Sequence, residues 1–86
     1  MRELERKLKA LANKRRLAIL KYLRKADQAS VGDVASQIRL SFRSTSKHLA
    51  VLFSTGILDK DQISLTVYYR LARPVDPLVS KVLDLV

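Results

Sequence analysis

The 86-residue sequence contains no cysteine and no tryptophan, one histidine, two glycines and two prolines. The absence of cysteine excludes a disulfide framework and the cysteine-ligated zinc sites. One histidine leaves no pair of groups for acid–base or nucleophilic catalysis, and two glycines supply no phosphate-cradling loop. We therefore predict that the chain is not an enzyme and needs no cofactor.

Long apolar runs are also missing. Arg2, Arg6, Lys7 and Lys9 interrupt the first apolar positions, which argues against a signal peptide. No stretch approaches the roughly 20 apolar residues that a membrane span needs. The sequence therefore predicts a soluble, cytoplasmic protein with one domain, residues 1–86, whose small core a partner subunit would help to stabilise.

Acidic residues are scarce, because 8 Asp and Glu stand against 17 Lys and Arg, for a formal net charge of +9. A domain this basic favours a polyanionic partner, since neutralising phosphates releases condensed counterions, and double-stranded DNA leads the candidates. Residues 1–25 hold ten of the basic groups and two acids. We expect some of these cations to flank a duplex and most to lie on solvated helix faces.

Residues 30–56 predict two short helices joined by a tight turn. Ser30 and Ser41 can cap the starts of the two helices, and Gly56 can close the second in the left-handed conformation. The helical spacing places three residues of the second helix on a core face: Thr45, Leu49 and Leu52. This pattern is typical of a helix-turn-helix, in which the second helix enters the major groove. An ordinary helical hairpin in a small core shows the same pattern.

The start of the second helix offers side chains that suit DNA. Arg43 is the best candidate for reading bases, since its fork can pair with guanine acceptors, while Lys47 and the neighbouring serines suit phosphates. Phe42 meets thymine methyl groups or tucks under the turn as core. His48 contacts DNA or bonds to a neighbour within the protein. The predicted DNA-binding residues are Ser41, Phe42, Arg43, Ser44, Ser46, Lys47, His48, Lys60, Gln62 and Arg70.

The remaining segments predict a wing and two terminal helices. Residues 57–62 and 66–72 are rich in β-branched and aromatic residues and predict a hairpin, while Asp76 and Pro77 can begin a last helix. Packing of the two terminal helices against a second subunit would give a two-fold dimer, and folding of the tail onto its own domain is the alternative. The predicted dimer interface comprises Leu4, Leu8, Leu11, Leu78, Val79, Val82, Leu83 and Val86.

Three motifs carry a family resemblance: LKALANKRRLAILKYL at 8–23, STSKHLAVLFSTGIL at 44–58 and VYYRL at 67–71. In this order they resemble the ArsR family of winged-helix transcriptional repressors, over roughly residues 4–72. The resemblance implies a homodimeric DNA-binding regulator with a mainly α fold and a small β-hairpin. The expected divisions are dimerisation helices at 1–12 and 77–86, a helix-turn-helix at 30–56 and a wing at 57–72.

The sequence also departs from that family. Its metal sensors use cysteines in the first helix of the pair, or carboxylates and histidines in the last helix. Here the last segment offers only Asp76 and Asp84, so we expect no metal site. The wing has Asp59 and Asp61 where arginines are commoner, and Ser64 stands where a glycine usually turns the chain. We therefore expect this wing to add less to DNA affinity.

The predicted function is sequence-specific regulation of transcription by a homodimeric repressor. Two rivals remain open at this point. A winged-helix module that binds acidic protein surfaces would explain the acidic wing and the charge near the N-terminus. A non-specific DNA-binding protein would show steep salt dependence without sequence preference.

Overall fold

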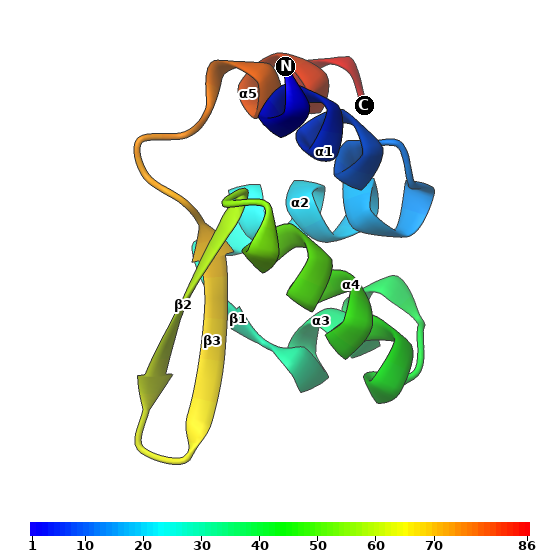
Figure 1. The fold of residues 1–86 in the computed structure, drawn as a ribbon. Coiled ribbons are helices and arrows are strands. Elements are labelled where there is room, and N and C mark those ends of the chain that lie inside the picture. The colour runs from blue at the N-terminus through cyan, green and yellow to red at the C-terminus, as the bar shows by residue number, and fades with distance from the viewer.

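The computed structural model describes residues 1–86, which form five helices and a three-stranded antiparallel sheet (Figure 1). The elements are α1 (Arg2–Leu11), α2 (Lys14–Ala26), β1 (Ala29–Ser30), α3 (Val31–Ile38), α4 (Phe42–Ser54), β2 (Leu58–Ile63), β3 (Thr66–Leu71) and α5 (Pro77–Leu85). The predicted mainly α, winged helix-turn-helix fold is confirmed. None of the helices combines the length and apolar character that a membrane crossing requires.

In Figure 1, α1 and α5 lie at one end of the molecule and α2 crosses its middle. Helices α3 and α4 lie below α2, and the β2–β3 hairpin runs along one side. The buried side chains come from every layer, and α2 contributes three of them with almost no exposed surface: Ile19, Leu20 and Leu23. One apolar core centred on α2 therefore joins the helix-turn-helix, the sheet and the terminal helices.

Helix starts are set by side chains that accept hydrogen bonds from first-turn N–H groups, which have no partner within the helix. Asn13, Ser30, Ser41 and Asp76 each accept such a bond at the start of α2, α3, α4 and α5. After α4 the chain turns through Gly56 at a φ of 77°, the left-handed conformation that glycine adopts without steric cost. The capping roles predicted for Ser30, Ser41 and Asp76 are thus confirmed.

The sheet contains one strand more than the sequence predicted. No strand was predicted before α3, but Ala29 and Ser30 pair with Tyr69 and Tyr68 of β3. Strand β3 therefore lies between β1 and β2. A two-residue strand has no periodicity of its own, so only its partner reveals it. The pairing fixes the base of the hairpin to the start of α3.

The terminal helices correct part of the predicted dimer interface. Leu11, Val79 and Leu83 are each at most 4% exposed and belong to the chain's own core, so they offer no surface to a second subunit. In α5 the i, i+4 spacing places Val79 and Leu83 on the helix face that packs against α2. Leu78 and Val82 are half-buried. The exposed apolar residues of the two helices and their ends are Met1, Leu4, Leu8, Leu85 and Val86.

Thr45 is a polar residue inside the core. Its side chain is fully buried beneath α4, and its Oγ1 atom has no hydrogen-bond partner. We expect Thr45→Val to raise the free energy of unfolding by about 1 kcal/mol, because an isosteric methyl removes an unsatisfied buried hydroxyl. Denaturant unfolding of both proteins measures the difference. A loss of stability would show that the hydroxyl has a partner in solution.

An ion pair fastens α1 to the start of α5. Lys7 Nζ lies 2.6 Å from Asp76 Oδ2, while Asp76 Oδ1 accepts from the backbone N–H of Leu78 at 2.9 Å. The bond from Lys7 lowers the pKa of Asp76 below its usual range, and the N–H of Leu78 lowers it further. The same bond raises the pKa of Lys7. One carboxylate therefore caps α5 and ties it to α1.

Replacing this carboxylate should loosen the end of the molecule. We expect Asp76→Ala to lower Tm by about 4–8 °C, the effect of losing a helix cap worth about 1 kcal/mol. Because the pKa of Asp76 is depressed in the folded state, its contribution is present at neutral pH and is lost as pH falls through that pKa, below pH ~4. The difference in Tm from the parent protein should therefore shrink on acidification. Asp84→Ala, which removes an exposed partner of Arg24, is the control.

Candidate nucleic-acid interface

Helix α4 is held from one side and exposed on the other. Thr45, Leu49 and Leu52 have no exposed surface and fix the helix against the core, as predicted. Arg43 and Lys47, one turn apart, are exposed, and α4 contains no acidic residue. The α4 face that the protein leaves free is therefore basic near its N-terminal end, where the helix dipole is also positive.

The turn before α4 is built by backbone geometry. Arg39 adopts the left-handed conformation, with a φ of 56°, and the N–H of Leu40 donates to the carbonyl of Ala35 at 3.0 Å. The hydroxyl of Ser41 accepts from the N–H of Ser44 at 3.1 Å and is thereby engaged in capping. Phe42 is 63% exposed, so the interpretation that it tucks under the turn is wrong. The ring of Phe42 is therefore exposed to solvent at the N-terminal end of α4.

His48 faces inward. Its Nδ1 accepts a hydrogen bond from Nε of Arg16 on α2 at 3.3 Å, and Arg16 also donates to the carbonyl of Ala10 at 3.4 Å. Burial lowers the pKa of His48, and the charges of Arg16 and Arg15 lower it further, which favours the neutral ring. Of the two interpretations of His48, the structure shows the bond to a neighbour within the protein. Any contact with DNA is left to its Nε2–H.

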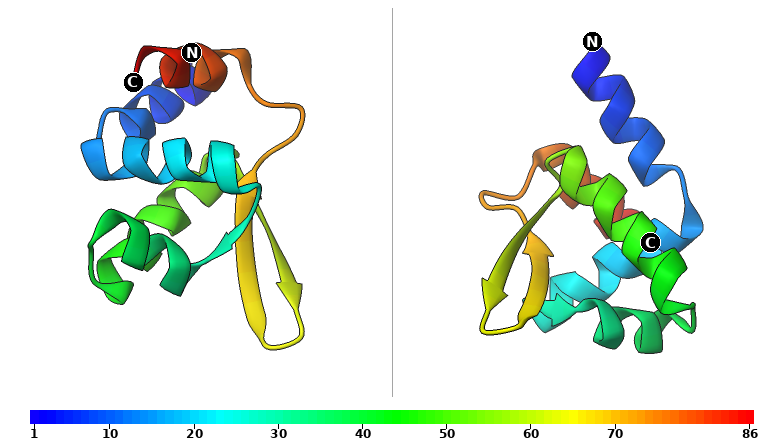
Figure 2. Two further views of the ribbon diagram at one scale, coloured as in Figure 1. Left: turned by 180° about the vertical axis from the view of Figure 1, so that it is seen from behind. Right: turned by 60° about the horizontal axis from the view of Figure 1, so that its bottom comes forward.

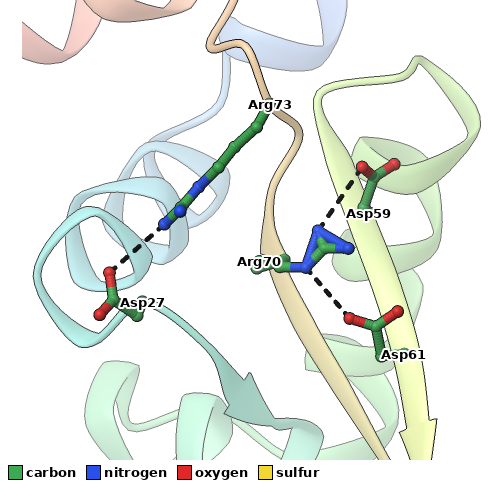
Figure 3. Close-up of polar contacts among 5 residues, drawn as sticks. All are labelled: Asp27, Asp59, Asp61, Arg70 and Arg73. Atoms are coloured by element: carbon green, nitrogen blue, oxygen red, sulfur yellow. Dashed lines mark hydrogen bonds and ion pairs between the residues drawn. The ribbon is translucent and has the colours of Figure 1, made fainter.

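The wing holds Arg70 in an internal ion-pair cluster. Figure 3 shows its guanidinium between two carboxylates of β2, 3.6 Å from Asp59 and 3.1 Å from Asp61. Asp59 and Arg70 are directly paired in the register of the two strands. Nearby, Arg73 pairs with Asp27 at the end of α2 at 3.5 Å. Arg70 was predicted to bind DNA, but its positive charge is already paired with two carboxylates of the wing.

The other predicted wing residues alternate with these acids along β2. Lys60 lies with its Nζ 4.4 Å above the ring of Phe53, near the end of α4. Gln62 donates through Nε2 to the carbonyl of Ser64 at 3.3 Å, and Ser64 takes a φ of 57° in the turn where a glycine was expected. Successive side chains of a strand point to opposite faces. Lys60 and Gln62 therefore share the face of β2 that does not bear the two carboxylates.

Substitutions in this ion-pair cluster can show whether Arg70 neutralises the wing carboxylates or contacts DNA directly. We expect Arg70→Ala to weaken DNA binding roughly threefold at low salt, because it leaves two wing carboxylates to repel phosphates. If Arg70 acts only by neutralising them, the triple variant Arg70→Ala/Asp59→Asn/Asp61→Asn regains the parent affinity. An affinity that stays low in the triple variant would instead show a direct contact between Arg70 and DNA. Anisotropy titrations of the three proteins on one duplex decide.

The structure brings together no group of three or more His, Asp or Glu side chains that could hold a metal ion. What it presents is a helix-turn-helix with a free basic face beside a hairpin. The family model of bacterial regulatory proteins of the arsR family matches residues 13–60, more than half of the chain. The chain belongs to the ArsR family. That family consists of bacterial regulatory proteins rather than enzymes, as the sequence predicted.

Three known proteins show how far the likeness extends. The transcriptional activator HlyU of Vibrio cholerae is 42% identical over 65 residues, which cover 76% of this chain and 59% of HlyU. The chain thus spans less than two thirds of that relative. The structure of reduced HlyU from Vibrio cholerae matches with a TM-score of 0.80 and 35% identity, over 96% of this chain and 83% of that one.

Two further structures are similar over almost the whole chain. A homodimeric winged helix-turn-helix DNA-binding domain from Mycobacterium bovis has a TM-score of 0.81 and 30% identity, over 96% of this chain and 73% of that one. The transcriptional repressor PagR of Bacillus anthracis has a TM-score of 0.78 and 26% identity, over 95% of this chain and 93% of that one. Over 95% or more of its length, the chain therefore shares its fold with these three solved proteins.

Proposed function

We propose that this ArsR-family chain is a homodimeric, sequence-specific repressor that acts in the bacterial cytoplasm. The observation that carries the proposal is the free basic face of α4, opposite a face fixed by three fully buried side chains. A rigid helix with exposed Arg43 and Lys47 suits insertion into a major groove, where Arg43 reads guanine and Lys47 holds a phosphate. Ser44, Ser46 and Phe42 complete the contact, with Lys60 and Gln62 on the adjacent wing.

A dimer is proposed because apolar residues remain exposed on α1 and at the C-terminus. Leu4 and Leu8 are 48% and 46% exposed, and Leu85 is 85% exposed. Helices α1 and α5 lie at the end of the molecule opposite the wing tip (Figure 1). The similar domain from Mycobacterium bovis is itself homodimeric. A two-fold axis at this end would present two α4 helices about 34 Å apart to a pseudo-palindromic operator.

Repression is the proposed direction of control. Among the relatives, PagR is a repressor and HlyU an activator. A dimer bound across a promoter denies that DNA to other proteins without further contacts. The rival idea of a protein-binding module loses one of its two supports, because both wing acids that suggested it are paired with Arg70.

Two measurements test the proposal. Anisotropy titrations compare the promoter upstream of the chain's own gene with scrambled DNA of equal length and composition, at two salt concentrations. We expect tighter binding to the promoter that persists at the higher salt; equal binding that vanishes with salt would contradict sequence specificity. A reporter behind the same promoter should then fall in output when the protein is expressed. A rise would make the protein an activator.

A further inference from the structure

A second basic surface lies on α2. A groove of about 440 Å³ runs between α2 and the end of α3, and we call it the α2 groove. Four cationic side chains line it: Lys14, Arg15, Lys21 and Lys25. No acidic residue lines the groove, and none of these four makes an ion pair with a carboxylate. The α2 groove is thus a concentration of positive charge without a carboxylate partner.

The sequence of α2 explains the shape of this groove. Lys14, Ala18, Lys21 and Lys25 follow the i, i+4, i+7, i+11 spacing that places residues on one helical face. Ala18 in their midst has only a methyl group, which leaves room between the lysines. Tyr22 and Ile38 supply apolar surface beside the cations. An open groove of this volume, lined by cations beside an apolar wall, has room for a small anionic molecule.

The α2 groove does not belong to the DNA-binding face. Its stripe is opposite the α2 residues Ile19, Leu20 and Leu23, which are buried in the core that α2 shares with α4. No residue of α4 or of the wing lines it. Seen from behind (Figure 2, left), α2 lies in front and α4 passes behind it. A duplex held by the free face of α4 therefore lies on the other side of the molecule.

We propose that the α2 groove binds a nucleoside polyphosphate. The cations suit a chain of phosphates, because charge-assisted bonds to phosphate oxygens are among the strongest hydrogen bonds in proteins. Tyr22 and Gln37 line the same groove, so a base bound there would lie beside the half-buried aromatic ring of the first and the amide of the second. Inorganic polyphosphate satisfies the cations but not the apolar wall, so the nucleoside form binds more tightly.

The position of the groove also connects it to α4. Arg15 lines the groove and donates through Nη1 to the carbonyl of Ile38 at 3.5 Å, at the last residue of α3. The next residue, Arg16, holds His48 on α4. A polyphosphate that draws the guanidinium of Arg15 into the groove removes a donor from the turn that aims α4. Ligand binding would thereby change DNA affinity. This regulatory role rests on the proposed function, whereas the binding of the ligand to the α2 groove does not depend on it.

Calorimetric titration of the intact protein with ATP, GTP and inorganic tripolyphosphate tests the binding step at physiological salt without DNA. For the parent protein we expect saturable binding of a nucleotide and weaker binding of tripolyphosphate. The variant Lys21→Gln/Lys25→Gln removes two charge-assisted bonds and should lose at least about tenfold in nucleotide affinity. Lys9→Gln/Lys81→Gln makes the same change in net charge at exposed lysines of α1 and α5 and should bind as the parent does. Ala18→Leu, which fills the groove without changing charge, should also bind less.

Three results would overturn the proposal. The first is the absence of saturable nucleotide binding. The second is an equal loss in the groove variant and in the charge-matched control, which would reduce the effect to net charge. The third is a loss of DNA affinity, measured without nucleotide, in the groove variant alone, which would assign the α2 groove to duplex phosphates. If nucleotide binds as expected but DNA affinity is unaffected by it, the site stands and the regulatory role is wrong.

Discussion

Arg43→Ala should reduce the preference for the operator over a site with a substituted base by about tenfold to a hundredfold, the value of one bidentate arginine contact to guanine. The structure supports this size of effect, because Arg43 is exposed at the free face of α4 and makes no hydrogen bond or ion pair within the protein. Nothing in the fold depends on its side chain. The variant should therefore keep the parent's Tm and its affinity for scrambled DNA.

Lys47→Ala is the companion variant, one helical turn further along the same face. A lysine on a phosphate carries no sequence information, so its loss should weaken binding to operator and scrambled DNA equally and reduce the slope of log affinity against log salt by about 1. Lys81→Ala, an exposed lysine of α5, is the control for net charge. Anisotropy titrations on three duplexes measure all of these effects. An equal loss on every duplex for Arg43→Ala would show that it, too, only holds a phosphate.

Local features of the fold were predictable from the sequence because their causes are local. Ser41 and Asp76 cap helices through hydrogen bonds to residues two or three positions ahead, and the residue types with their spacing announce such bonds. The inward face of α4 follows from its period in the same way. Both predictions therefore needed only a window of a few residues.

The contacts that the sequence did not predict join residues far apart in the chain. His48 is held by Arg16 on another helix, and β1 exists only because β3 lies beside it. The cluster of Arg70 with Asp59 and Asp61 is an intermediate case. Its strands were predicted, and pairing Asp59 with Arg70 across the hairpin would have revealed it. The register depends on where the turn falls, and Ser64 in place of glycine obscured that point.

In the terminal helices the apolar pattern was predicted correctly, but the surface that part of it packs against was not. Most of their apolar residues were assigned to a second subunit, with folding of the tail onto its own domain as the alternative, and Val79 and Leu83 do lie in the core of their own chain. An apolar face indicates that something covers it and does not say what. The buried apolar residues of these helices complete the core of the monomer, and the exposed ones remain available to a second subunit. Leu83→Asp would consequently unfold the chain, so dimerisation must be tested at an exposed position.

Leu8→Asp is that test, and it should convert the protein to a monomer at concentrations at which the parent is a dimer. Leu8 is 46% exposed on α1 and belongs to no buried cluster, so a charge there does not disturb the core but opposes burial against a second subunit. Sedimentation equilibrium measures the change. Leu65→Asp, the same substitution at the 95% exposed wing tip, is the matched control and should remain dimeric.

The loss of the dimer should also remove most of the operator affinity. Two linked α4 helices bind their half-sites as one unit, because the first contact holds the second at a high effective concentration, and uncoupling them costs about a hundredfold or more in affinity. The Leu8→Asp monomer should therefore bind a full operator no better than a single half-site. A variant that stays dimeric in sedimentation would place the interface elsewhere. A monomer that retains full operator affinity would instead show that each chain binds DNA independently, and a two-fold operator would no longer be required.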